Sequence, residues 1–244
     1  MSLPKYLAQA NQLIAALPAG PQAIFVDCCE LIDMQRQDVL VQTGQYAEFA
    51  YFPIDSFVAN MFNLEDGQCL QVGLTGNEGM TSPVIALGRW VATLTIVVQG
   101  AGRAFRIHHR DLQKLISINP PLKDVIYKYI ASQLDQLARN MACASSHRVE
   151  QRLARWLLVV NDCLHSSELP LTQEMLASML GVRREQVTSV ASLLQKNGFI
   201  SYSRGNVTLL NVSGLRAIAC GCYQSGLQAS HSSPKKADQQ LFSY

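Results

Sequence analysis

Residues 171–200 constrain this chain more than any other stretch, because two amphipathic helical patterns lie there with a single glycine between them. Thr172 precedes the first pattern and suits a helix N-cap. The apolar residues of that pattern recur at helical spacing on one face: Met175, Leu176, Met179 and Leu180. Gly181 then permits a tight turn. The stretch therefore predicts a helix-turn-helix.

The second helix of this motif has one apolar and one polar side. Ala177 is small where the two helices must cross, and Val187 and Val190 are apolar anchors for the second helix. The outward side chains are Arg183, Arg184, Glu185, Gln186, Thr188 and Ser189. Arginine suits guanine, glutamate accepts from cytosine, and hydroxyls suit several bases. We expect this face to read base edges in the major groove of DNA.

Two short strand patterns follow the second helix, at residues 199–203 and 206–210, with Arg204 and Gly205 at the tip between them. Such a hairpin is a wing. Arg204 at its tip, together with Arg183 and Lys196, is predicted to contact phosphates. Any two amphipathic helices joined by glycine share part of the helix-turn-helix pattern, but the added wing favours a DNA reader.

Charge is distributed unevenly along the 244 residues, although the net charge is only +2. Residues 1–145 hold ten Lys and Arg against twelve Asp and Glu, whereas residues 146–224 hold eight against five. The basic excess therefore lies with the helix-turn-helix, which fits a sequence-specific binder better than a non-specific one. With 48% hydrophobic and 16% charged residues, the composition is that of an ordinary globular protein.

Several functional classes lack their sequence signals. The apolar runs are too short to cross a bilayer, and the start has no basic region followed by a hydrophobic core, so we expect a cytoplasmic protein with no membrane partner. No Gly-rich phosphate loop, nucleophile elbow or paired metal ligands point to an enzyme.

The first half of the chain has the pattern of an all-β domain after a short helical opening at residues 7–17. Asp66 and Gly67 form a strong hairpin signal. Candidate strands are residues 38–42, 49–53, 57–62, 69–74, 91–98 and 102–107. We therefore predict an α+β protein with an N-terminal β roll at residues 1–118, a dimerisation helix at 119–145, a winged helix-turn-helix at 146–224 and a disordered tail at 225–244.

The predicted long helix, from about residue 122 to 144, carries more apolar surface than one face can hold. One stripe contains Leu122, Val125, Tyr129, Leu134 and Met141. The other contains Ile126, Ile130, Gln133, Leu137 and Asn140 at the alternating spacing of a coiled-coil seam. We assign Ile126, Ile130, Gln133 and Leu137 to a dimer interface; a helix wholly buried in one chain is the alternative. A further amphipathic helix is expected at residues 147–163.

The seven cysteines show no recurrent metal-ligand spacing: Cys28, Cys29, Cys69, Cys143, Cys163, Cys220 and Cys222. We expect most of them to be buried, reduced thiols. The pairs Cys28 with Cys29 and Cys220 with Cys222 could be redox-active or bind an iron-sulfur cluster, which needs about four converging thiolates. No metal site and no cofactor is predicted.

This order of β domain, long helix and winged helix-turn-helix resembles the Crp/Fnr superfamily of bacterial transcription regulators from about residue 25 to 223. The strongest match is residues 181–187, GVRREQV, with an Arg-Glu pair. The resemblance implies Arg184, Glu185, Thr188 and Ser189 as base readers, a homodimer on a palindromic operator, and RNA polymerase as a further partner beside double-stranded DNA. It also implies that the β domain is a cyclic-nucleotide-binding-like roll, with residues 74–80 near its phosphate-binding cassette.

The chain departs from the relatives that bind cyclic AMP. They have an Arg followed by Ser or Thr for the phosphate, whereas here Arg89 is followed by Trp90. Without that charged partner we do not expect cyclic AMP control, and the effector is unknown. The N-terminal cysteine cluster of oxygen sensors is missing too, and haem could bind through His108 or His109. The alternative function is a ligand- or redox-sensing module in which the roll is the working part.

Overall fold

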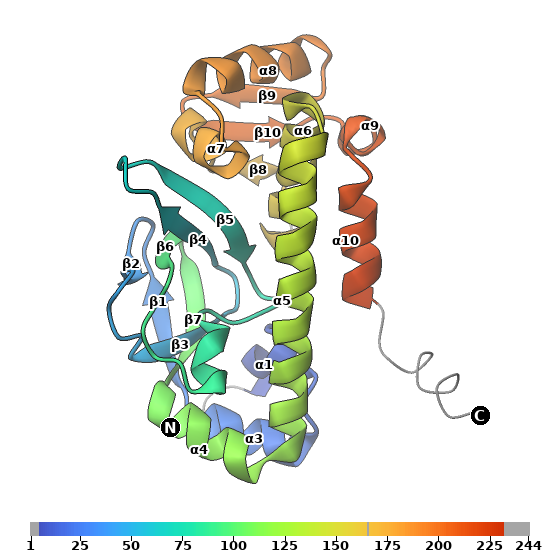
Figure 1. Cartoon of the computed structure of the whole chain (residues 1–244). Coiled ribbons are helices and arrows are strands. Elements are labelled where there is room, and N and C mark those ends of the chain that lie inside the picture. Colours follow the sequence, from blue (N-terminus) through green and yellow to red (C-terminus); the bar gives the residue numbers. More distant parts are fainter. Residues whose placement is uncertain (1–4, 165, 232–244) are drawn as a thin grey trace, which may run out of the picture.

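The computed structural model describes residues 5–164 and 166–231 and has the predicted α+β architecture. A β roll, a long helix and a winged helix-turn-helix follow one another along the chain (Figure 1). Among the described residues, no helix combines the length and the apolar character needed to cross a membrane.

Two antiparallel sheets form the roll. One sheet has the order β1-β7-β3, and the other has the order β2-β6-β4-β5. The strands are β1 Glu30–Met34, β2 Val39–Val41, β3 Phe49–Pro53, β4 Phe57–Asn63, β5 Cys69–Thr75, β6 Thr95–Gly100 and β7 Gly102–His108. The predicted hairpin at Asp66 and Gly67 is confirmed, because β4 pairs with β5 and Gly67 adopts φ +85° at the turn.

The roll differs from the sequence prediction at several edges. The helical opening is divided into α1 Lys5–Ala8, α2 Gln12–Ala15 and α3 Ala19–Asp27, of which α3 was not predicted. Asn11 separates α1 from α2: its buried side chain caps α2 and donates to the carbonyls of Pro53 and Gly79. Strand β1 was not predicted either, and β6 begins at Thr95 and not at Val91.

Helix α5, Pro120–Ser146, connects the two halves of the molecule. It follows the 3₁₀ helix η1 Pro83–Leu87 and the helix α4 His109–Ile118, and Asn119 caps its first turn by accepting from the backbone N–H of Leu122. Figure 1 shows α5 running from the roll to the helix-turn-helix, with α10 beside it.

The assignment of Ile126 to a dimer interface is wrong. Ile126 is wholly buried in the core of its own chain, together with Leu122 and Tyr129. Gln133 is half-buried and donates to Gln136 on the same helix. The error has a physical cause: the β roll covers a face of α5 that includes members of both predicted stripes.

The C-terminal half has the predicted winged helix-turn-helix, with elements α6 Val149–Leu164, β8 Glu168–Leu169, α7 Gln173–Leu180, α8 Arg184–Lys196, β9 Ile200–Ser203, β10 Asn206–Leu209, α9 Val212–Ile218 and α10 Cys222–His231. Strand β8, which was not predicted, extends the wing to three strands in the order β8-β10-β9. Residues 225–231 are helical and not a disordered tail, while residues 232–244 lie outside the described part.

The helix-turn-helix is docked on the roll of the same chain. Phe57 and Leu74 of the roll belong to the same apolar cluster as the core of the C-terminal half. The Ser178 hydroxyl of α7 donates to the Cys69 carbonyl of β5 at 2.7 Å. The two halves therefore share an apolar interface with polar contacts at its edge.

The expectation that most cysteines are buried is wrong. Cys29, Cys143 and Cys220 are buried, Cys163 and Cys222 are half-buried, and Cys28 and Cys69 are exposed. All seven are free of disulfides.

Candidate nucleic-acid interface

The turn between α7 and α8 depends on one left-handed residue. Thr172 caps α7 as predicted, since its hydroxyl accepts from the backbone N–H of Met175 at 3.2 Å. Gly181 ends α7 with φ +61°, and the next N–H, of Val182, closes on the Ala177 carbonyl. Val187 is wholly buried beneath this turn and Val190 is half-buried, so both valines seat α8 on α7 as the sequence predicts.

Substituting Gly181 tests this turn. A new Cβ at this position would meet no clash, since its nearest neighbour would be Leu70 Cδ2 at 3.9 Å, an ordinary van der Waals contact, so backbone strain is the main cost. We expect Gly181→Ala to lower the free energy of unfolding by about 1–2 kcal/mol, and Gly181→Asn to lower it less, because asparagine tolerates this conformation. Urea denaturation measures both. Gly20→Ala is the matched control, since Gly20 has open space without a positive φ; equal losses at both glycines would contradict the strain argument.

The polar face of α8 is open to solvent. All eight predicted DNA-contacting residues are exposed: Arg183, Arg184, Glu185, Gln186, Thr188, Ser189, Lys196 and Arg204. In Figure 1, α8 lies on the side of the helix-turn-helix that faces away from the roll. Docking of α7 on the roll therefore leaves the candidate reading face uncovered.

The side chains of this face are already oriented by hydrogen bonds. Arg184 Nε donates to Gln173 Oε1 of α7 at 3.1 Å. The hydroxyls of Thr188 and Ser189 donate to the carbonyls four residues earlier, each at 3.0 Å. Because those hydroxyl protons are used within the helix, the two oxygens face solvent as acceptors in this arrangement.

The wing tip lies beside the start of α7. Arg204 and Gly205 both have positive φ, +48° and +81°, in the two-residue turn between β9 and β10. A Cβ on Gly205 would lie 3.4 Å from the Thr172 side chain. Burial raises the pKa of Tyr202 on β9, while a hydrogen bond with the Gln173 backbone and the charge of Arg184 oppose that rise. The wing tip and the starts of α7 and α8 thus form one continuous surface.

The predicted DNA-contacting residues do not all lie together at the start of α8. Lys196 lies at the other end of α8, about 18 Å along the helix from Arg184. Helical periodicity places Glu185, Ser189, Ser192 and Lys196 on one exposed stripe. Ser192 was missed in the sequence, although this spacing could have identified it. The stripe connects the predicted base readers to the predicted phosphate contact.

Comparisons with known proteins agree with this geometry. Residues 151–218 match the family model of the Crp-like helix-turn-helix domain. A solved transcriptional regulator of the CRP/FNR family from Thermus thermophilus superposes with a TM-score of 0.66 at 21% identity, over 78% of this chain and 98% of that chain. Residues 151–218 therefore form a Crp-like helix-turn-helix domain, and the chain as a whole shares the fold of that solved regulator.

Two curated relatives match over a smaller share of this chain. The transcriptional regulator SdrP of Thermus thermophilus is 28% identical over 107 residues, and the match spans about half of its length, 53%, and 41% of this chain. The cAMP-activated global transcriptional regulator CRP of Pasteurella multocida is 21% identical over 189 residues, 72% of this chain and 88% of its own.

Residues 74–80, which the sequence resemblance places near a phosphate-binding cassette, pack tightly against α5. The Tyr129 hydroxyl donates to the Met80 carbonyl at 3.1 Å, and a Cβ on Gly79 would overlap the Tyr129 ring. Burial raises the pKa of Glu78, whose carboxylate accepts from the backbone N–H of Gly76 at 3.0 Å. Arg89 is exposed at the end of η1. Tyr129 thus ties residues 79–80 to the long helix.

Polar contacts also connect the roll with the Crp-like domain through α5. Asn140 donates to the Val72 carbonyl of β5 at 3.2 Å and accepts from Arg155 of α6 at 2.5 Å. Arg155 is buried and lies over the Trp156 ring.

His108 lies elsewhere on the roll, at the end of β7. It caps α4 by accepting from the Arg110 N–H. That contact gives His108 a structural role.

Proposed function

We propose that this chain is a sequence-specific DNA-binding transcription regulator that acts as a homodimer on a palindromic operator. The observation that carries the proposal is the exposed polar face at the start of α8, with Arg184 held by Gln173 and the wing tip alongside. Guanidinium, carboxylate and hydroxyl groups on the first turns of such a helix can each pair with base edges. This function implies a cytoplasmic protein whose partners are double-stranded DNA and RNA polymerase.

An exposed apolar seam on α5 supports the homodimer. Tyr127, Leu134, Leu137 and Met141 are 42%, 63%, 45% and 75% exposed. With the half-buried Ile130 and the exposed Ala144 they follow the three-four spacing of heptad a and d positions. We name residues 127, 130, 134, 137, 141 and 144 the α5 seam. A second copy of the chain, with the same seam, is the complementary partner for such spacing.

A two-fold dimer gives the reading helices a defined spacing. Two copies of α8 would enter successive major grooves of one face of DNA, about 34 Å apart. The operator is then expected to be palindromic, because the two-fold axis of the protein must coincide with that of the site.

Substitutions on α8 test sequence reading. We expect Arg184→Ala or Glu185→Ala to weaken operator binding by about 1–3 kcal/mol and to relax the preference at one base pair in each half-site. The operator is first selected from a random DNA pool with the purified wild-type protein. Affinity and base preference of each variant are then measured by fluorescence anisotropy on a panel of single-base operator changes.

Matched controls separate reading from charge. Arg89→Ala and Glu65→Ala remove the same residue types from exposed positions on the roll, so both should retain wild-type affinity and preference. If both α8 variants also kept wild-type affinity and preference, α8 would not be the reading helix.

The alternative function is a ligand- or redox-sensing module in which DNA binding is lost or secondary. It predicts saturable binding of a cyclic nucleotide, haem or an oxidant without any retained DNA association. The uncovered α8 face beside the wing tip supports the regulator instead, because guanidinium, carboxylate and hydroxyl groups on the first turns of such a helix can pair with base edges. Titrating each compound in the presence and absence of operator DNA discriminates between the two functions.

A further inference from the structure

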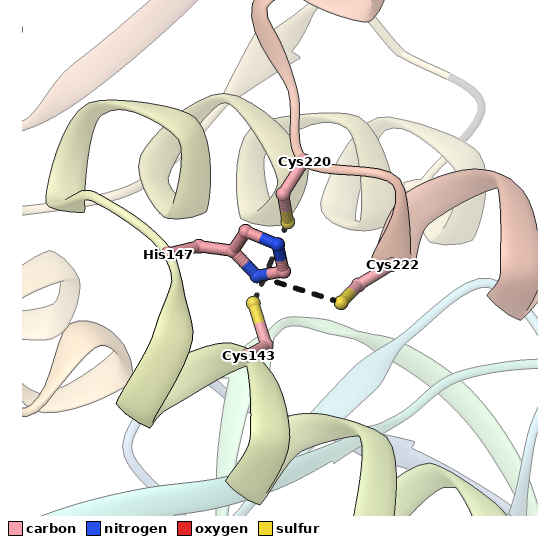
Figure 2. Close-up of side chains that lie close together, drawn as sticks. All are labelled: Cys143, His147, Cys220 and Cys222. Atoms are coloured by element: carbon pink, nitrogen blue, oxygen red, sulfur yellow. Dashed lines mark hydrogen bonds between the residues drawn. The ribbon is translucent and has the colours of Figure 1, made fainter.

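Three thiols and an imidazole converge where α5, α6, α9 and α10 meet. Cys143 and His147 lie one helical turn apart at the end of α5, and His147 is the C-cap residue before α6. Cys220 and Cys222 flank the junction between α9 and α10. Figure 2 shows the four side chains pointing toward one another, with the imidazole ring among the three sulfurs.

The spacing of the four side chains matches the shell of a single small ion. Cys143 Sγ lies 3.5 Å from Cys220 Sγ, and Cys222 Sγ lies 3.7 Å from His147 Nδ1. All four candidate ligand atoms fall within 4.8 Å of one another. Around tetrahedral zinc, with Zn–S bonds of about 2.3 Å, neighbouring sulfurs are about 3.8 Å apart.

Other uses of these residues fit the geometry less well. An iron-sulfur cluster inserts several irons and bridging sulfides between its ligands, which requires the thiolates to lie farther apart than they do here. A disulfide between Cys143 and Cys220 would need the sulfurs at about 2.05 Å and would leave Cys222 and His147 without a role. Hydrogen bonding among thiols is weak and does not explain the convergence of four ligand groups.

We propose that Cys143, His147, Cys220 and Cys222 bind one zinc ion in a closed tetrahedral site. Thiolates and imidazole are the soft and intermediate ligands that select zinc over magnesium, calcium or manganese. Four protein ligands leave no open coordination position, so the ion is structural and not catalytic.

The position of the site gives the ion a mechanical role. Cys143 and Cys220 are 77 residues apart, and the whole Crp-like domain, residues 151–218, lies between them. The ion would join the C-terminal end of the α5 seam to the segment between α9 and α10, where the chain leaves the Crp-like domain. Such a cross-link fixes the domain against the dimerisation helix at the joint between α5 and α6. Its effect on DNA affinity rests on the proposed function, but its effect on stability does not.

Metal content tests the proposal directly. Full-length chain is purified under reducing conditions with zinc present, and metals are measured by inductively coupled plasma mass spectrometry. We expect about one zinc per chain. Replacing the zinc with cobalt should give the intense ligand-field bands of tetrahedral cobalt and a thiolate-to-cobalt charge-transfer band. Removing the metal with a chelator should lower the thermal midpoint by about 5 °C or more, and added zinc should restore it.

Matched variants assign the ion to this site. Cys222→Ser and His147→Ala remove half-buried ligands and should abolish the bound zinc and the tetrahedral cobalt spectrum. Cys28→Ser and Cys69→Ser remove exposed thiols that lie outside the cluster, so both should retain one ion per chain. The cobalt spectrum of the wild-type chain tests the ligand set even where a variant folds poorly.

Three results would overturn the proposal: a wild-type chain that takes up no zinc after reconstitution, iron with sulfide in place of zinc, or an octahedral cobalt spectrum. None of these measurements involves DNA. A failure of the metal site is therefore distinguishable from a failure of the proposed regulator function.

Discussion

Replacing both Leu134 and Leu137 with glutamate is expected to convert the proposed homodimer to monomers and to weaken operator binding by about 10²–10⁴-fold. The two leucines are 63% and 45% exposed in the protomer, so the change should leave each chain folded. In the dimer each leucine would contribute about 1.5–3 kcal/mol if fully buried. Four glutamates placed in one apolar seam would lose that contribution and repel one another. Once the dimer is lost, the second reading helix is no longer held near its half-site.

Analytical ultracentrifugation measures the assembly state, and anisotropy titration measures operator affinity. Ile118→Glu is the matched control, because Ile118 is 74% exposed but lies at the end of α4, outside the α5 seam. It should leave both measurements unchanged. A double variant that still sediments as a dimer would show that copies of the chain associate through another surface.

Operator affinity is also expected to fall by about 10³-fold when the salt concentration rises from about 50 mM to about 200 mM. Arg183, Lys196 and Arg204 are the predicted phosphate contacts, and all three are exposed. A dimer would therefore neutralise about six phosphates, and each phosphate contributes about −0.9 to the slope of log K against log salt. Arg204 is well placed for such a contact, because it lies at the wing tip beside the start of α7.

Variants assign this salt dependence to particular side chains. Arg204→Ala should reduce the steepness of the slope by about 2 in the dimer and weaken binding to all sequences alike. Arg89→Ala, an exposed arginine on the roll, should leave the slope unchanged. An Arg204→Ala slope equal to that of the wild type would remove the wing tip from the DNA interface.

The helix-turn-helix was predictable because its determinants are local. Thr172, Gly181 and Val187 act within one or two turns of the chain: a cap, a left-handed residue and a buried anchor. The exposure of the α8 face follows from the same periodicity, since burying Val187 forces its polar neighbours outward. Strand β8 and helix α3 lack such local signals. Strand β8 has only two residues and is defined by its pairing with β10, whereas α3 is defined by its packing on the roll.

The division of α5 between core and seam was not predictable from its own pattern. Ile126 and Leu134 are both apolar and both belong to regular helical stripes, but Ile126 is buried and Leu134 is exposed. Which stripe faces the roll depends on the shape of the roll, where Tyr129 meets Met80 and Asn140 meets Val72. Only the tertiary structure fixes the rotation of the helix about its axis.

The sequence alone determined the α+β class, the winged helix-turn-helix and the exposed polar face of α8, because caps, turns and helical periodicity act over a few residues. The tertiary structure alone decided the α5 seam and the cluster of Cys143, His147, Cys220 and Cys222. The two halves of that cluster are separated by the whole Crp-like domain, so their approach depends on how α9 and α10 return to α5. No spacing rule along the chain contains that information, since it arises from packing between distant elements.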